Sequence, residues 1–351
     1  MQSLSFLKIM LSGMLVIILA ASCVKEGPMG LPGEDGQDGQ NGLDGADGQV
    51  TCLACHSGDN IKTIQGQFAM SVHKAGLNAV ENAGARAACT RCHSHEGFVQ
   101  YAELGSVAGN ITDPAAWECG TCHQIHETFE TSDYALRLND PVQANFNTTV
   151  TMDLIGNNNL CANCHQSRAA EPLIASPGAE TFEITSTHYG PHYSTQANVV
   201  AGMGLAEIEG SVAYPEAGSN YHLNEQASCN GCHMGEFENG QGGHTWVPSV
   251  ESCNTCHDTP DYNYGGRQTD VAASLAEIQA KLLEFGIIAG DEENGYHPVA
   301  GTYPIILVRA YFNWDGVKKD RSLGVHNPRY VNALLTNTLE ALNAYQPAPE
   351  V

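Results

Sequence analysis

Basic residues are scarce in this chain of 351 residues. Only 15 Lys and Arg stand against 39 Asp and Glu, which gives a formal net charge of −24 at pH 7. A surface this acidic repels nucleic acid and anionic lipid headgroups, so no nucleic-acid partner is expected. It favours basic patches on a partner protein or cationic metal centres, although solubility alone is an alternative explanation of the charge.

Aromatic residues are also few, at 7% of the composition. A chain of this length with so few rings must fill its interior in another way. Glycine, Asn and Ser are abundant, and no repeat of fixed period runs through the chain. These features predict long loops, short helices and few strands.

Cysteine and histidine, by contrast, recur in one fixed pattern. Cys-x-x-Cys-His occurs six times, whereas random placement of 13 Cys and 15 His would give roughly 0.02 copies. This is the attachment signature of c-type haem, in which two thiols add to the haem vinyl groups and the following histidine ligates the iron. The motif cysteines are Cys52, Cys55, Cys89, Cys92, Cys119, Cys122, Cys161, Cys164, Cys229, Cys232, Cys253 and Cys256. The motif histidines are His56, His93, His123, His165, His233 and His257.

Two other uses of paired cysteines are possible. A Cys-x-x-Cys pair is half of a tetrahedral zinc site, and twelve cysteines in an exported chain could form six disulfides. Neither alternative explains a histidine directly after every second cysteine. We therefore expect six haem c groups, whose faces would also replace the missing aromatic side chains in the core.

On these motifs, residues 51–351 resemble the multihaem c-type cytochromes, a superfamily that contains outer-surface electron carriers and nitrite-reductase-like enzymes. The resemblance implies a mainly α fold with extensive loops and a core made largely of stacked haems. It also implies electron transfer. Ammonia-forming nitrite reductases of this superfamily carry a lysine in one haem motif, and no motif here ends in lysine. A carrier is favoured over a nitrite- or hydroxylamine-processing enzyme, and a subunit of a haem-stacked filament is a third possibility.

The resemblance further implies distal iron ligands among the nine histidines outside the motifs. Several lie in segments that resemble distal-ligand segments of the superfamily, and others shortly precede a later motif. His192 is near enough to His188 to be mistaken for it, and it is the main substitute for His126. His95 and His297 are weaker candidates, and Met234 is assigned to packing. The predicted distal ligands are His73, His126, His188, His222, His244 and His326.

The first 22 residues have the features of a signal peptide. Lys8 precedes an apolar run, and the stretch ending at Cys23 resembles a bacterial lipoprotein cleavage box. Cys23 is then the lipidation site, although an ordinary secretory signal is the alternative. Export agrees with c-type haem, which the resemblance implies is attached outside the cytoplasmic membrane.

Residues 23–50 form a candidate spacer. Glycine recurs at every third position from Gly27 through Gly48, which is the collagen pattern, and acidic residues lie between. A short collagen-like trimer and a flexible acidic linker are both possible. Outer-surface multihaem lipoproteins resemble this layout, so the haem domain is expected at the outer membrane facing the cell surface. Its partners would be other redox proteins or an external acceptor such as a mineral, a soluble shuttle or a neighbouring cell.

Two helices are predicted near the C-terminus. Apolar residues at three- and four-residue intervals from Val271 to Phe285 are followed by Gly286, a residue typical of helix ends. Asn327 and Pro328 mark the start of a second helix, whose apolar stripe runs from Val331 to Leu342. Both stripes are expected to pack in the core.

Overall fold

The computed structural model describes residues 56, 58–125, 135–258 and 261–347, and all of them belong to one compact unit, Val50–Val351. The signal peptide, the lipidation site Cys23 and the spacer lie outside the described residues, as do Cys52, Cys55 and His126. Across the described ranges, no helix has both the length and the apolar character needed to cross a membrane.

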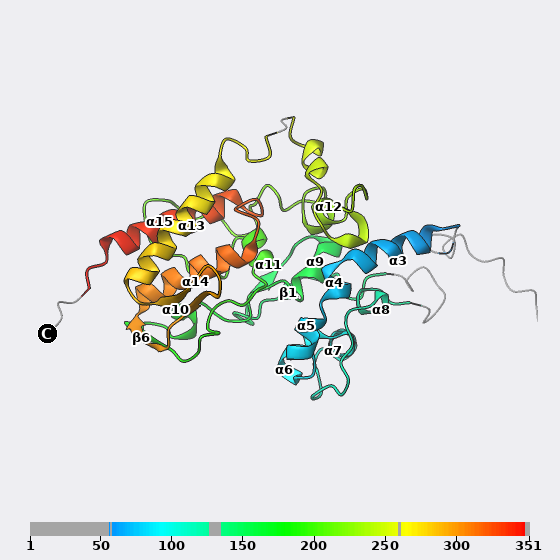
Figure 1. The fold of residues 1–351 in the computed structure, drawn as a ribbon, viewed down its shortest axis with the longest axis horizontal. Helices are drawn as coiled ribbons and strands as arrows, with labels where there is room; N and C mark the ends of the chain where they lie inside the picture. The colour runs from blue at the N-terminus through cyan, green and yellow to red at the C-terminus, as the bar shows by residue number, and fades with distance from the viewer. Residues whose placement is uncertain (1–55, 57, 126–134, 259–260, 348–351) are drawn as a thin grey trace, which may run out of the picture. The chain divides into compact units, whose positions relative to one another are not determined.

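Three long helices near the C-terminus pack against one another (Figure 1). They are α13 (Arg267–Glu284), α14 (Ile305–Asp320) and α15 (Pro328–Ala344). The predictions for α13 and α15 are confirmed. Gly286 follows α13 with φ of 68°, which glycine adopts without a Cβ penalty, and the Asn327 side chain caps α15 by accepting a hydrogen bond from the Tyr330 N–H.

Helix α14 was not predicted, because its sequence lacks the apolar stripe of a surface helix. Buried side chains occur around its whole circumference, and they include the polar Asn313 and Asp315. Asn313 satisfies its buried amide by bonding to both backbone groups of Ala206 and to the Thr338 hydroxyl. Together α13, α14 and α15 carry most of the main hydrophobic core, which is centred on Trp314, Tyr311, Tyr330 and Phe312.

The remaining helices are short and lie between loops. In the first part of the described chain they are α3 (Asn60–Met70), α4 (Val72–Ala75), α5 (Leu77–Ala79), α6 (Ala87–His93), α7 (His95–Leu104) and α8 (Cys119–Cys122), with a π turn at Val80–Gly84. In the middle they are α9 (Asn159–Ala162), α10 (Pro172–Ala175), α11 (Gln196–Ala201) and α12 (Cys229–His233). Short segments of 3₁₀ helix occupy Gly156–Asn158, Gly243–Thr245 and Val250–Thr255.

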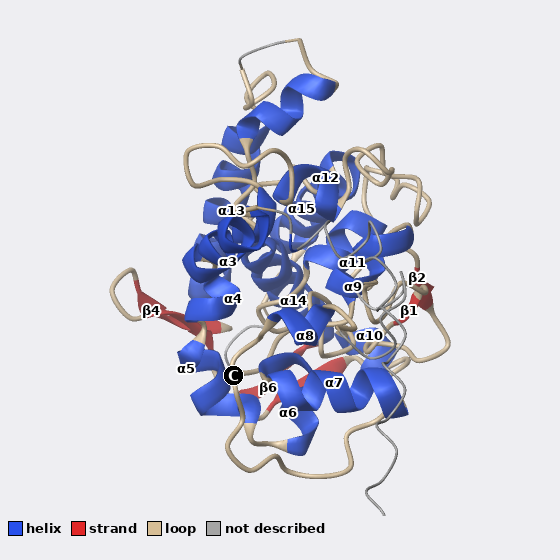
Figure 2. Cartoon of the chain, turned by 90° about the vertical axis from the view of Figure 1, so that its right-hand side faces the viewer, coloured by secondary structure: helices blue, strands red, loops and turns tan. Residues whose placement is uncertain are grey.

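Strands are few and short, as Figure 2 shows. The described residues form three antiparallel pairs: β1 (Val142–Gln143) with β2 (Thr151–Met152), β3 (Thr181–Ile184) with β6 (Gly301–Pro304), and β4 (Ile288–Asp291) with β5 (Gly295–Pro298). A second, smaller core lies against β1 and β2 and includes Phe146, Leu154 and Val200. The prediction of a helix-rich chain with extensive loops is therefore confirmed.

Candidate haem-binding site

Each described motif forms about one helical turn. The histidine N–H donates to the carbonyl of the first motif cysteine in three of them, at 3.0 Å for His123, 2.9 Å for His165 and 2.8 Å for His257. In the other two the motif ends a helix, α6 at His93 and α12 at His233. A helical turn places side chains three residues apart on one face, so the two thiols and the imidazole project toward the same region.

The ten described motif cysteines are all free thiols. Within the same part of the chain, no three His, Cys, Asp or Glu side chains converge into a metal cluster of the kind that a zinc site requires. Thiols of different motifs instead approach one another: Cys92 interacts with Cys164, and Cys161 with Cys229. The fourth motif therefore lies beside both the second and the fifth.

All these motif side chains open onto one cavity of about 3220 Å³. Pockets for a single ligand measure about 300–1,000 Å³, so this space is several times too large for one small molecule. The cavity is lined by all six motif histidines and by the ten described cysteines. Apolar side chains that are exposed to it, such as Val72, Tyr221 and Tyr264, would be covered by large apolar groups lying in the cavity.

Five pairs of histidines face each other around the cavity. Each pair joins one motif histidine to one histidine from outside the motifs, and the ring centroids are 5.9–6.5 Å apart. Two metal–nitrogen bonds of about 2 Å each, with half a ring at either end, give a centroid separation of about 6 Å. One iron atom therefore fits between the rings of every pair. The pairs are His165 with His73, His93 with His192, His123 with His244, His257 with His222, and His233 with His326.

The angle between the two ring planes differs from pair to pair. The interplanar angle is 86° for His73 and His165, 80° for His222 with His257, and 67° for His93 with His192. It falls to 37° for His123 with His244 and 39° for His233 with His326. The pairs thus divide into three steeply crossed and two more nearly parallel ones.

Four of the six predicted distal histidines take part in these pairs: His73, His222, His244 and His326. A fifth, His126, lies outside the described residues. The sixth, His188, is exposed and does not line the cavity.

His192 stands in the place that the sequence assigns to His188. Its φ of 79° is unusual for a residue other than glycine, and Gly190 just before it has φ of 137°. The turn made by these residues carries the His192 ring to 5.9 Å from His93. A backbone conformation of this kind is often retained at ligand-binding positions. The sequence offered two histidines four residues apart and no means of choosing between them.

The two weaker candidates lie elsewhere. The Nδ1 of His95 is 2.7 Å from the Thr121 hydroxyl, and His297 is exposed on β5. Neither lines the cavity. His56 lines the cavity.

Burial keeps many of the paired histidines neutral. Burial, and secondarily the nearby His165, lowers the pKa of His73 to about 4, and burial with the charge of Arg168 lowers that of His192 to about 4. Burial also lowers the pKa values of His93, His165, His233 and His244. Neutral imidazole is the form that binds a metal, so these side chains are ready to act as ligands at neutral pH.

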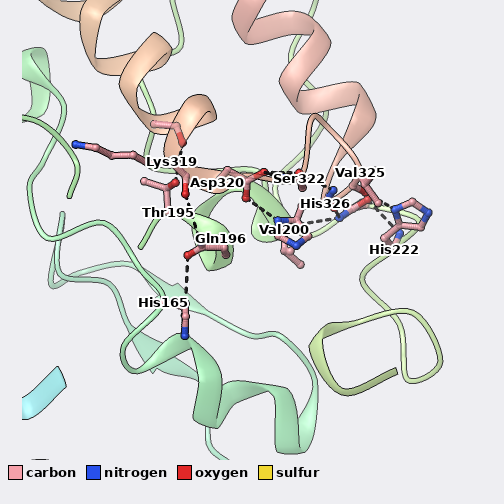
Figure 3. Close-up of polar contacts among 12 residues, drawn as sticks. His165, Thr195, Gln196, Val200, His222, Lys319, Asp320, Ser322, Val325 and His326 are labelled. Carbon is pink, nitrogen blue, oxygen red and sulfur yellow. Dashed lines mark hydrogen bonds and ion pairs between the residues drawn. The ribbon is translucent and has the colours of Figure 1, made fainter. Parts of the chain in front are cut away.

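Hydrogen bonds from a ring nitrogen hold several of the paired imidazoles in place. His233 bonds to the Trp246 carbonyl at 2.8 Å, and His222 to the Val325 carbonyl at 2.6 Å. His165 lies 3.3 Å from the Gln196 amide oxygen, and His326 lies 2.6 Å from the Asp320 carboxylate (Figure 3). Such contacts fix ring orientation and tune a bound metal.

Arginine gathers around the cavity. The chain has eight arginines, and six of them line it: Arg86, Arg91, Arg168, Arg267, Arg321 and Arg329. None of these six forms an ion pair with a carboxylate of the described residues, whereas Arg137 and Arg309, which do not line the cavity, each do. In a chain so rich in acids, cations left without carboxylate partners fit anions that are carried by the bound group itself.

No protein-family model matches the chain, and no curated protein matches it. Its fold is similar to that of the outer cell wall cytochrome OcwA, with a TM-score of 0.51 and 19% identity over 80% of this chain. A weaker likeness, with a TM-score of 0.48 and 18% identity, is to the undecahaem cytochrome from the S-layer of Carboxydothermus ferrireducens, over 79% of this chain and 41% of that one. The chain spans half the length of OcwA. The fold is thus a cytochrome fold, as the resemblance drawn from the motifs predicts.

Proposed function

We propose that this protein is an electron carrier that holds six covalently attached c-type haems and works at the cell surface. The observation that carries the proposal is the set of five histidine pairs with ring centroids 5.9–6.5 Å apart, each built on a haem-attachment motif. A bound haem supplies an iron that takes up and releases one electron. With an imidazole on either side, that iron has no free position for a small molecule, which favours a carrier over a nitrite- or hydroxylamine-processing enzyme.

The chain's own residues have three tasks in this proposal. The motif cysteines would hold each haem by thioether bonds, and the paired histidines would supply the two protein ligands of its iron. The six arginines around the cavity pair with haem propionates, which would otherwise add to the negative charge of the protein. For the first motif, Cys52 and Cys55 would attach the haem and His56 would be the proximal ligand. His126 is kept as a proposed distal ligand with no motif assigned to it.

Close contact between motifs supports transfer within the protein. The interacting thiols of Cys92 with Cys164 and of Cys161 with Cys229 become thioether sulfurs once haem is attached. The second, fourth and fifth motifs would then attach their haems at neighbouring points, and the fourth motif would contact both of the others.

We further propose that Cys23 carries a lipid anchor and that residues 23–50 hold the haem domain away from the membrane. The net charge of −24 would direct it to basic patches on a partner or to a cationic external acceptor. The similar OcwA is an outer cell wall cytochrome, which agrees with a surface location. In a strain that makes c-type cytochromes, Cys23→Ala should release haem-loaded protein in soluble form, and retention in the membrane fraction would contradict the anchor.

Haem content tests the main proposal. The intact mass of the purified protein should exceed that of the processed, lipidated chain by six haems, and the haem stain should survive denaturing electrophoresis because the bonds are covalent. Changing both Cys161 and Cys164 to Ala should remove one haem, while changing Cys23, which is outside the motifs, should remove none. A mass without haem, or with bound zinc, would overturn the proposal.

A further inference from the structure

Hydrogen bonds link the connection between α14 and α15 to three of the paired histidines, His165 through Gln196 and His222 and His326 directly (Figure 3). At the end of α14, the Lys319 carbonyl accepts a hydrogen bond of 3.1 Å from the Gln196 amide, whose oxygen faces His165. Next along the chain, Asp320 faces His326 at 2.6 Å. The Val325 carbonyl accepts the hydrogen bond from His222 at 2.6 Å.

These three contacts differ in chemistry. Gln196 and Val325 offer neutral oxygens, and so does Trp246 to His233. Asp320 instead offers a carboxylate oxygen to the Nδ1 of His326. Its side chain is 0% exposed, so water does not screen its charge.

The local structure fixes Asp320 in this position. It is the last residue of α14, and Arg321 then turns the chain with φ of 63°. One carboxylate oxygen, Oδ2, accepts hydrogen bonds from the Ser322 hydroxyl and backbone N–H, while Oδ1 faces His326. The Ser322 hydroxyl also accepts the His326 N–H at 3.2 Å, and Asn220 binds the His326 carbonyl at 2.6 Å.

We infer that Asp320 is a positioning residue that lowers the reduction potential of the iron that His233 and His326 would hold. A carboxylate on Nδ1 increases the electron donation of the imidazole to the metal and so stabilises the ferric form. His233 adds to this effect through its bond to the Trp246 carbonyl. The inference rests on the proposed function, because it requires haem at the fifth motif.

The test is spectroelectrochemical titration of the haem-loaded protein and of three variants. Asp320→Asn keeps an oxygen for the His326 N–H but removes the charge, so one one-electron step should move to higher potential. We expect at least a tenfold change in that ferric/ferrous equilibrium, equivalent to about 59 mV for one electron. Ser322→Ala removes a hydrogen bond that draws charge from the carboxylate, so the same step should move to lower potential.

Asp315→Asn is the matched control. It removes a buried carboxylate from the same helix, and the partners recorded for Asp315 are Lys319 and Tyr311 rather than a ligand histidine. It should leave the step of the His233–His326 iron in place. The EPR signal of this more nearly parallel pair should change in Asp320→Asn and not in the control.

Two results would overturn the inference. One is that no step moves in either Asp320→Asn or Ser322→Ala, and the other is an equal upward shift in Asp315→Asn. If Asp320→Asn fails to retain six haems, Ser322→Ala provides the test. A shift of one step to lower potential in Ser322→Ala supports the role of Asp320, and a step that does not move refutes it. Haem content separates the two proposals: a wild-type protein without haem contradicts the proposed function, whereas a fully loaded one whose steps do not respond contradicts this inference alone.

Discussion

The sign of the nearest charged side chains differs from one histidine pair to the next around the cavity. Arg168 lowers the pKa values of both His93 and His192, and Lys319 and Arg86 each act on one of the two. All three charges are positive, whereas Asp320 places a negative charge beside His326. Cations near a bound iron would favour its ferrous form. The potential at the His93–His192 site should therefore be raised, and the potential at the His233–His326 site should be lowered.

Arg168→Gln should therefore lower the potential of one haem, that of the second motif, because a positive charge near its ligands is lost. Lys281→Gln, on α13 and away from the cavity, is the control and should leave every step in place. The same titration measures both. A rise in potential, or an equal change in the control, would contradict the assignment of this cation to the second haem.

Buried Asp315 should give the stability of the protein a specific pH dependence. Burial raises the pKa of Asp315 above its ordinary value, although Lys319 opposes this effect. The folded state then binds a proton more tightly than the unfolded state, so this residue's contribution to stability is lost as pH rises from about 4 through the raised pKa.

Asp315→Asn removes that loss, so the free energy of unfolding of the variant, relative to wild type, should increase with pH across this window. Asp291→Asn is a control of opposite sign, since hydrogen bonds from Asn294 lower the pKa of Asp291. Its relative stability should fall as pH rises through the acidic range. Chemical denaturation at a series of pH values gives both curves, and parallel curves for the two variants would refute the assignment.

At the scale of elements, local signals predicted α13 and α15 but not α14. The first two helices have an apolar stripe on one face and recognisable ends at Gly286 and Asn327. Helix α14 is buried on all sides by tertiary contacts, which leave no periodic pattern in the sequence. The same division applies to the site: the motif histidines follow from a local turn, whereas the pairing of His73 with His165 depends on how distant segments pack.

An ion pair ties α14 to α10. Arg309 contacts Glu171 at 3.0 Å, with side-chain exposures of only 13% and 6%. Arg309→Met leaves a buried carboxylate without a partner, so the free energy of unfolding should fall by about 3–5 kcal/mol. Lys62→Met is the matched control, because the Lys62–Asp59 pair is 77% and 84% exposed and should matter by less than about 1 kcal/mol. Guanidinium denaturation measures both, and equal effects would show that the buried pair does not stabilise the fold.

For the whole molecule, the chain combines a cytochrome fold with an interior that its side chains do not fill. The cavity has a volume of about 3220 Å³, and histidine pairs, thiols and arginines line it. All of these features suit several haem groups. The sequence predicted the attachment residues directly, because the motif carries both covalent bonds and one ligand. It did not predict which distal histidine serves which haem, since each pair joins segments that meet only in the folded chain.

The most direct test of the account is low-temperature EPR of the fully oxidised, haem-loaded protein, before and after addition of nitrite or hydroxylamine. We predict low-spin ferric signals only, unchanged by either addition. Highly anisotropic signals should arise from the three steeply crossed pairs, at 67–86°, and rhombic signals from the two pairs at 37° and 39°. A high-spin ferric signal that shifts with nitrite or hydroxylamine would mean an open iron, and it would contradict a dedicated electron carrier.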